Sequence, residues 1–216
     1  MKVFFDSILD LIFPPRCEVC RKSNKAALCP ACYKQIKFMK PHLGIHSVSV
    51  YDGVLREAIH RFKFNGRKRL AEPLGVLMVE YLSSMPSLDP AELDMIVPVP
   101  LHPRRLRERG FNQVELLGSV LGKYFGLPLS PVLHRVRDTR AQFDLPREER
   151  FKNIIGAFAV NNGQVAGKRV ILLDDIYTTG ATLSECAKAL SEAGANRVEV
   201  VTLSRAVDHE PGSVAG

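Results

Sequence analysis

The sequence predicts an α/β protein in which a parallel sheet is flanked by helices and is preceded by a small four-cysteine zinc-knuckle subdomain. Two observations carry this prediction. From about residue 95 to residue 205, strand-like apolar runs alternate with helix-like segments, which is the order that a parallel sheet covered by helices requires. Near the N-terminus, two C-x2-C pairs lie close together in the spacing of a structural zinc site.

The composition is that of an ordinary globular protein, with 216 residues of which 46% are hydrophobic and 25% are charged. The net charge of +7 and the pI of about 9.3 favour an anionic ligand, nucleic acid or both, although a solvated basic surface would give the same charge. No apolar run reaches the ~18 residues that a membrane span needs. We therefore expect a cytoplasmic protein without a transmembrane segment.

The apolar start of the chain, MKVFFDSILDLIF, invites comparison with a signal peptide. Asp6 and Asp10 interrupt the apolar run, and no small-residue cleavage site follows, so we reject that interpretation. The apolar residues recur at helical spacing, which predicts an amphipathic helix packed on the body of the protein. Attachment of this helix to a membrane surface is the alternative. With the cysteines that follow, this helix forms the first predicted unit, residues 1–44.

Cys17 and Cys20 form the first C-x2-C pair, and Cys29 and Cys32 form the second. Each pair lets two thiolates approach one ion, so together they predict a structural Zn²⁺ site with no open position for a catalytic water. Two disulfides or a redox dithiol are the alternative, which a cytosolic chain disfavours. So small a segment has almost no core, and metal binding would supply most of its folding free energy. The fifth cysteine, Cys186, falls on the apolar face of a predicted helix, and we interpret it as a buried structural thiol.

The remaining elements follow in chain order. We expect strands at 46–52, 95–100, 132–136, 156–160, 168–175 and 197–205, and helices at 55–64, 70–85, 111–126 and 181–194. A loop with two prolines near residue 90 separates a hood-like unit, 45–92, from a core unit, 93–216. Residues 170–173 have no polar face, which predicts a central strand. The polar stretch 137–153 is expected to be a loop.

Two acids and a threonine–glycine turn follow the predicted central strand. Ligands of open α/β sheets bind beyond the carboxyl ends of the strands, where Asp174 and Asp175 stand. Gly180 lets the backbone approach a ligand, and the N–H groups of the next helical turn suit a phosphate. The acids would repel that phosphate and are better placed on the hydroxyls of a ribose, so the stretch suits a ribose 5-phosphate. The alternative is a helix cap with two solvated acids, but a cap needs only one such residue.

This stretch resembles the phosphoribosyl pyrophosphate (PRPP) loop of type I phosphoribosyltransferases. The wider chain, from about residue 10 to 205, resembles the ComF family of that superfamily, which includes competence proteins and GntX-like proteins. The resemblance is carried by the cysteine pairs, FKFNG at 62–66, DMIVPVPLHPRRLRERGFNQ at 94–113, and Arg135, Thr139, Gln142, Arg150 and Asn153. It implies a type I phosphoribosyltransferase-like core whose PRPP-binding residues are Asp174, Asp175, Thr178, Thr179, Gly180, Ala181 and Thr182.

The resemblance also implies two further groups of site residues. The turn 100–105, after the first core strand, would grip pyrophosphate through His102, Arg104 and Arg105, although these arginines also fit a general basic surface. The stretch 137–153 resembles the mobile loop that closes over PRPP, with Arg137, Gln142 and Arg150 as candidate residues. Mg²⁺ would bridge the diphosphate. Displacement of pyrophosphate from ribose C1 would depend on positioning and charge stabilisation, and we assign no catalytic residue.

Three functions remain open at this stage. The resemblance favours a PRPP-binding phosphoribosyltransferase-family protein that acts in competence and DNA uptake. The alternatives are a non-catalytic, PRPP-regulated factor that binds single-stranded DNA, and a nucleobase-type phosphoribosyltransferase unrelated to DNA uptake. Phe62 and Phe64 alternate with Arg61 and Lys63, a pattern that suits stacking on the bases of single-stranded DNA. Phe62 also fits the apolar face of a helix that packs in the core. The sequence identifies neither the acceptor nor the oligomeric state.

Overall fold

The computed structural model describes residues 14–42, 44–137, 139, 147–161 and 163–207. The predicted N-terminal amphipathic helix, the C-terminal tail and Gln142 lie outside these residues. Among the helices that the structure describes, none has the length and apolar character needed to cross a membrane.

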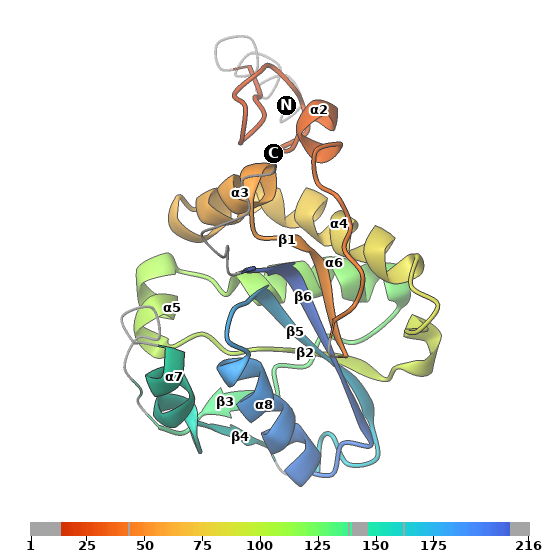
Figure 1. Ribbon diagram of the computed structural model, residues 1–216, viewed down its shortest axis with the longest axis vertical. Coiled ribbons are helices and arrows are strands. Elements are labelled where there is room, and N and C mark those ends of the chain that lie inside the picture. The colour runs from red at the N-terminus through yellow and green to blue at the C-terminus, as the bar shows by residue number, and fades with distance from the viewer. Residues whose placement is uncertain (1–13, 43, 138, 140–146, 162, 208–216) are drawn as a thin grey trace, which may run out of the picture.

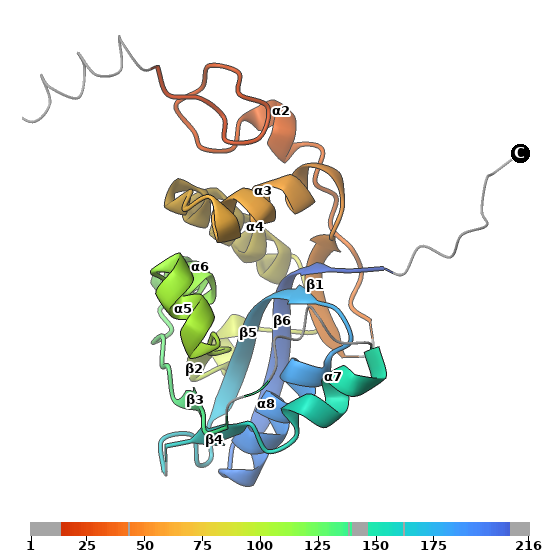
Figure 2. The same ribbon diagram turned by 90° about the vertical axis from the view of Figure 1, so that its left-hand side faces the viewer.

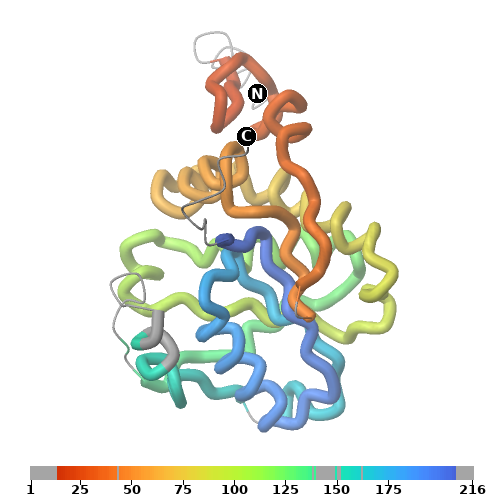
Figure 3. The backbone as a smooth tube through the Cα atoms, viewed as in Figure 1, coloured from red at the N-terminus to blue at the C-terminus, as the bar shows by residue number. Residues whose placement is uncertain are grey.

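A four-stranded parallel sheet forms the centre of the molecule, in the order β1-β6-β5-β2 (Figure 1). Its strands are β1 (Ile45–Val50), β6 (Arg197–Arg205), β5 (Arg169–Tyr177) and β2 (Met95–Pro98). The predicted central position of the apolar strand is confirmed, because β5 is hydrogen-bonded to β6 on one side and to β2 on the other. β1, which we assigned to the hood, pairs with β6 and so belongs to this sheet. Figure 3 shows these two segments running side by side, although they lie far apart in the sequence.

Helices cover both faces of the sheet (Figures 1 and 2). The first face packs against α3 (Gly53–Phe64), α4 (Ala71–Ser83) and α6 (Gln113–Phe125), and the second packs against α8 (Ala181–Glu192). Alternation along β5 divides its side chains between two cores. Ile171 and Leu173 lie with α3, α4 and α6, whereas Val170 and Leu172 lie with α8. This alternation also decides where the acids that follow point.

The ends of α6 and α8 follow from local sequence. Asn112 caps α6 by accepting a hydrogen bond from Val114 N at 3.0 Å, and Gly126 ends it in the left-handed conformation. α8 begins after Gly180, as predicted, and short 3₁₀ turns occupy Lys68–Leu70 (η1) and Pro90–Glu92 (η2).

Three predictions about the elements needed correction. β3 (Leu133–Arg135) and β4 (Phe158–Val160) do not join the parallel sheet, because they pair antiparallel with each other in a separate two-stranded sheet. The segment after β2 is a helix, α5 (Pro103–Arg109), that starts with proline at its first position, where the missing N–H costs nothing. The second part of the predicted loop 137–153 is also helical, forming α7 (Arg147–Ile154).

The N-terminal subdomain stands above α3 and α4, on the side away from the sheet (Figure 2). It contains the short helix α2 (Pro30–Tyr33), which carries the last cysteine of the cluster. Between this subdomain and β1, Met39 N donates to Val48 O at 3.0 Å, so the connecting segment is held against the edge of the sheet.

Candidate functional site

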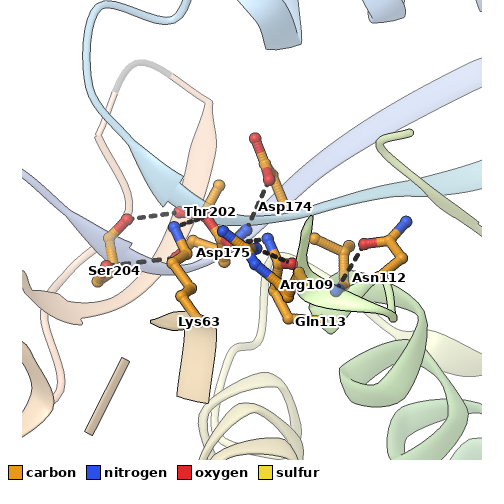
Figure 4. A network of polar contacts seen from close by, with 9 residues as sticks. Lys63, Arg109, Asn112, Gln113, Asp174, Asp175, Thr202 and Ser204 are labelled. Carbon is orange, nitrogen blue, oxygen red and sulfur yellow. Dashed lines mark hydrogen bonds and ion pairs between the residues drawn. The ribbon is translucent and has the colours of Figure 1, made fainter. Parts of the chain in front are cut away.

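The two acids of the predicted PRPP loop lie within β5, which continues to Tyr177, two residues past the predicted end of the strand. Because neighbouring residues of a strand point to opposite faces, Asp175 faces α3 and α6, whereas Asp174 faces α8. Figure 4 shows Asp174 pointing away from the group of side chains that surrounds Asp175. The two acids therefore stand in different environments.

Asp175 is buried, with 5% of its surface exposed, and both of its carboxylate oxygens accept hydrogen bonds. Lys63 Nζ, from the last turn of α3, donates to Oδ1 at 2.7 Å, and Gln113 Nε2, from the first turn of α6, donates to Oδ2. Arg109 Nη1, at the end of α5, donates in turn to Gln113 Oε1. This Lys63–Asp175–Gln113–Arg109 network (Figure 4) satisfies a carboxylate whose burial without partners would be costly.

Asp174 is half-buried, and its Oδ1 accepts a hydrogen bond from Asp175 N at 2.8 Å. Burial and the neighbouring Asp175 charge raise the pKa of Asp174 to about 7, against the opposing influence of that hydrogen bond and of Lys63 and Arg135. A carboxyl group with this pKa is able to hold or release a proton near neutral pH.

Polar side chains of β1 and β6 surround the backbone of this strand end. Ser204 Oγ donates to Asp175 O at 3.3 Å, and Thr202 Oγ1 lies 2.8 Å from Ser47 Oγ of β1. All three hydroxyl residues are buried and hydrogen-bonded, so they hold the carboxyl edge of the sheet in place.

The turn between β5 and α8 has the geometry that its sequence predicted. Gly180 has φ +80°, and a Cβ there would lie 2.8 Å from the hydroxyl oxygen of Tyr177. Thr179 Oγ1 accepts a hydrogen bond from Ala181 N at 3.4 Å, and Ser184 N donates to Gly180 O at 2.8 Å, closing the first turn of α8. Thr178 is exposed, whereas Thr179 and Thr182 are half-buried. The turn thus places hydroxyls and a helix N-terminus at one spot.

The predicted pyrophosphate residues lie at the start of α5. His102 caps this helix, since its Nδ1 accepts a hydrogen bond from Arg104 N at 3.2 Å. Arg104 is exposed and donates from Nε to Glu108 at 2.8 Å, while Arg105 is half-buried. Their roles at pyrophosphate stay predictions.

The predicted closing loop is described only in part. Arg137 donates from Nη2 to the carbonyls of Asn153 and Ile155, both at 2.8 Å, and so binds the C-terminal end of α7. Arg135 lies over the ring of Phe158, with 4.9 Å from its Cζ to the ring centroid. Gln142 and the side chain of Arg150 lie outside the described residues, so their predicted roles stay predictions.

The four N-terminal cysteines form one cluster, in which every pair of Sγ atoms lies within 4.8 Å. The Sγ atoms of Cys20 and Cys29 lie 3.6 Å apart and those of Cys17 and Cys32 lie 3.8 Å apart, and all four thiols are free. Burial opposes the charged thiolate of Cys17, but backbone N–H groups, among them Cys29 N at 3.4 Å, lower its pKa to about 6. The arrangement fits a structural four-thiolate Zn²⁺ site and not the two disulfides of the alternative.

Five basic residues lie within positions 61–69: Arg61, Lys63, Arg67, Lys68 and Arg69. Part of this basic run binds the N-terminal subdomain to the hood helices. Arg61 donates to Glu18 O, Arg67 Nε lies 3.6 Å from Glu18 Oε2, and Arg69 Nη2 donates to Lys25 O at 3.0 Å. Phe62 is 1% exposed and packs in the core, whereas Phe64 is 66% exposed. The interpretation of Phe62 as a core residue is therefore confirmed. Of these two phenylalanines, Phe64 is the one whose ring is exposed to solvent.

Sequence reasoning missed two members of the network around Asp175. Lys63 follows buried Leu55 and Ile59 at helical spacing, and that register would have placed it on the inner face of α3. Arg109 carried no such signal, because its position depends on α5. Gln113, at the start of α6, points toward Asp175, while Asn112 forms the cap of that helix.

Two family models match this chain: a double zinc ribbon domain over residues 8–43 and a phosphoribosyl transferase domain over residues 117–211. Together with the parallel sheet and the cysteine cluster, they define a protein with a phosphoribosyltransferase-type core and an N-terminal zinc ribbon.

Curated relatives identify the family. Competence protein F of Haemophilus influenzae is 31% identical over 208 residues, covering 88% of this chain and 90% of the relative. Competence protein ComFC of Streptococcus pneumoniae is 32% identical over 203 residues, covering 93% and 85%. DNA utilization protein YhgH of Salmonella typhimurium is 33% identical over 204 residues, covering 88% and 89%. The chain therefore belongs to the ComF/ComFC/YhgH family, which confirms the resemblance found in the sequence.

Proposed function

We propose that this protein binds PRPP at the carboxyl edge of β5 and acts as a phosphoribosyltransferase-family protein in competence and DNA uptake. The observation that carries the proposal is the junction of β5 and α8, where two acids precede a left-handed Gly180 and a helix N-terminus. A phosphate at such an N-terminus meets N–H groups and the positive end of the helix dipole. Membership of a family whose relatives are named for competence and DNA utilization supports the biological role.

In this proposal, Thr178 through Thr182 hold the 5-phosphate, and the two acids accept hydrogen bonds from the ribose hydroxyls. A carboxylate has about four acceptor sites, so Asp175 is able to accept further bonds besides those from Lys63 and Gln113. Asp174 binds hydroxyls best when ionised, and its raised pKa couples ribose binding to release of a proton near neutral pH. Mg²⁺ would bridge the diphosphate through phosphate oxygens and water.

For the diphosphate itself, His102, Arg104 and Arg105 are the nearest candidates along the chain, since they follow β2, the neighbour of β5 in the sheet. Their role would be to neutralise pyrophosphate as it leaves ribose C1. Arg137 and Arg150, from the stretch that resembles the closing loop, would add positive charge. The acceptor that completes a transfer reaction is not specified by these groups.

Calorimetric titration of the zinc-loaded protein with PRPP, with and without Mg²⁺, tests the proposal. We expect saturable binding that Mg²⁺ strengthens and that the Asp174→Asn/Asp175→Asn double variant weakens at least about tenfold. Asparagine preserves the shape of both side chains, which matters because Asp175 is buried among Lys63 and Gln113.

The matched control is Asp89→Asn/Asp94→Asn, which changes two acids near the amino edge of the sheet. Asp89 caps η2, and Asp94 Oδ2 accepts a hydrogen bond from Arg169 N at 2.7 Å. This control should bind PRPP as the wild type does. If the wild type binds no PRPP, or if both double variants lose it equally, the proposal is wrong. Release of pyrophosphate in the presence of candidate acceptors then separates an enzyme from a binding protein.

A second candidate function, PRPP-regulated binding of single-stranded DNA, is favoured by a groove between the zinc ribbon and the hood. The groove has a volume of about 470 Å³ and is lined by Pro14, Pro15, Arg16, Glu18, Arg21, Arg67 and Arg69. Four arginines against one acid suit a phosphodiester backbone. Fluorescence anisotropy of a labelled single strand, with and without PRPP, measures this binding. Binding that does not weaken with added salt, or that survives Arg16→Gln/Arg21→Gln unchanged, would exclude the groove.

A further inference from the structure

Phe64 is an exposed aromatic ring in a strongly basic neighbourhood, beside the network around Asp175. Its ring is 66% exposed, although it follows directly on Lys63, which is buried against Asp175. Most exposed apolar residues need no explanation, but the ring of this one also contacts two polar side chains. The Arg109 guanidinium lies 5.4 Å from its ring centroid, and the His60 ring lies 5.0 Å away at an angle of 43°.

The charges near this ring are mostly positive. Lys63 pairs directly with the buried carboxylate of Asp175, whereas Arg109 reaches that carboxylate through Gln113. Burial lowers the pKa of Arg109, Asp175 raises it, and the charge of Arg105 lowers it again, which shows that Arg105 also lies within electrostatic reach. Lys63 is paired with Asp175, and the charges of Arg109 and Arg105 add positive charge beside the exposed ring. Figure 4 shows Lys63 and Arg109 reaching the network from their two helices.

A ring and a cation favour different parts of one ligand. The face of Phe64 that is open to solvent offers stacking to any flat ring, and stacking on aromatic side chains is tolerant of the ring's identity. Lys63 and Arg109 offer charge-assisted hydrogen bonds, which favour carboxylate or phosphate. A neutral flat ring would use only the first, and inorganic phosphate only the second.

We infer that His60, Lys63, Phe64 and Arg109 form a binding surface for a flat aromatic ring that carries a negative charge. We call this group the Phe64 surface. The inference deepens the proposed function and rests on it for position, because the surface adjoins Asp175 and so would receive the partner of the phosphoribosyl group. The negative charge is either a carboxylate on the ring itself or the phosphate of a nucleotide that carries the ring, and both ligands combine a flat ring with an anion.

Four probes separate the contributions of ring, charge and source. Uracil supplies a neutral ring, and orotate is the same ring with a carboxylate. Uridine 5′-monophosphate supplies a ring with a phosphate, and inorganic phosphate supplies the charge alone. With PRPP present, we expect orotate or uridine 5′-monophosphate to bind at least about tenfold more tightly than uracil and than phosphate, because each uses both ring and charge. Calorimetry and ligand-detected NMR measure this, and whichever of the two binds identifies the source.

Substitutions at two equally exposed aromatics test the place of binding. Phe64→Leu should weaken binding of the charged ligand roughly tenfold, since stacking on the Phe64 ring is lost, and Phe64→Tyr should restore that binding. The control is Tyr124→Leu on α6, because Tyr124 is 67% exposed and also contacts a neighbouring ring, Phe125, at 5.1 Å. Thermal unfolding of all three variants confirms that they remain folded.

The inference is overturned if uracil binds as tightly as both charged rings, if phosphate alone binds as tightly as they do, or if no probe binds. It is also overturned if Phe64→Leu and Tyr124→Leu behave alike. The same titrations with PRPP alone keep the two proposals apart. If PRPP binds and the charged rings do not, the Phe64 surface is wrong and the PRPP site stands. If the charged rings bind the Phe64 surface and the protein does not bind PRPP, the Phe64 surface stands and the PRPP site is wrong.

Discussion

The ammonium nitrogen of Lys63 lies 2.7 Å from a carboxylate oxygen of Asp175, and both side chains are largely buried. This ion pair joins α3, in the hood, to β5, the central strand of the sheet. Gln113 from α6 binds the other oxygen of the same carboxylate, so three elements meet at one acid of the proposed PRPP loop. The position of the hood is thereby linked to the residue proposed to bind ribose.

Removing the positive partner of Asp175 should destabilise the protein. Lys63→Met keeps the length of the side chain but leaves the buried carboxylate with Gln113 alone. We expect the free energy of unfolding to fall by about 2 kcal/mol, which lowers Tm by roughly 4–8 °C in a chain of this size.

The control for Lys63→Met is Arg104→Met, since Arg104 pairs with Glu108 while its side chain is 77% exposed. Such exposed pairs contribute only about 0–1 kcal/mol. Scanning calorimetry or thermal denaturation followed by circular dichroism measures both variants. Equal Tm values for the two would show that the Lys63–Asp175 pair contributes no more than a surface pair.

The raised pKa of Asp174 predicts a pH-dependent difference between the wild type and Asp174→Asn. The folded pKa is about 7, above the ordinary value of 3.8, so between these values the folded protein holds a proton that the unfolded chain releases. The wild type should therefore lose stability as pH rises through this window. Asparagine keeps the acceptor for Asp175 N and does not titrate.

Urea unfolding at pH 5 and at pH 8 measures this effect. We expect the free energy of unfolding of Asp174→Asn, relative to that of the wild type, to rise by roughly 2 kcal/mol from pH 5 to pH 8. A difference between the two proteins that stays constant with pH would mean that Asp174 does not titrate in this range.

The turn at Gly180 should tolerate no side chain. Gly180→Ala places a Cβ 2.8 Å from the Tyr177 hydroxyl oxygen and 2.9 Å from its Cε2, at φ +80°. We expect PRPP affinity to fall at least about tenfold, because either the ring of Tyr177 or the backbone of the proposed phosphate turn must shift.

Gly163→Ala is the matched control for Gly180→Ala, since Gly163 has the same φ of +80° and a Cβ there meets nothing within 4 Å. It carries the conformational cost of about 1–2 kcal/mol without the clash. Titration with PRPP should separate the two variants, and equal affinities would remove Gly180 from the proposed phosphate site.

Removal of zinc should release the N-terminal subdomain while the sheet stays folded. Chelation, or Cys20→Ser, is expected to remove about one Zn²⁺ per chain, and residues 14–42 should then lose protection from hydrogen exchange. The contacts of Arg61, Arg67 and Arg69 with this subdomain should be lost with it. Hydrogen exchange with mass spectrometry follows both changes.

Cys186→Ala is the control for zinc removal, because Cys186 is a buried thiol on α8, outside the cysteine cluster. This variant should keep its zinc. If mass spectrometry finds the same metal content in Cys20→Ser as in the wild type, the four-thiolate site is contradicted.

Local patterns in the sequence determined the elements whose signals are short in range. The two C-x2-C pairs predicted one cluster, because this spacing lets four thiolates approach a single metal ion. The apolar run before Asp174 predicted a central strand because only an internal strand buries both of its faces. Gly180 and Gly126 marked a helix start and a helix end through their left-handed conformations.

Tertiary structure alone decided which residues meet. The sequence placed Asp174 and Asp175 together, but the alternation of β5 sends them to different faces and gives them different partners. Lys63 reaches Asp175 across 112 positions of the chain, and no local pattern encodes a contact of that range. The basic run 61–69 was equally uninformative about its division between docking the zinc ribbon, through Arg61, and pairing with Asp175, through Lys63. Periodicity fixes the face that a residue takes on its own element, whereas packing between elements fixes what that face touches.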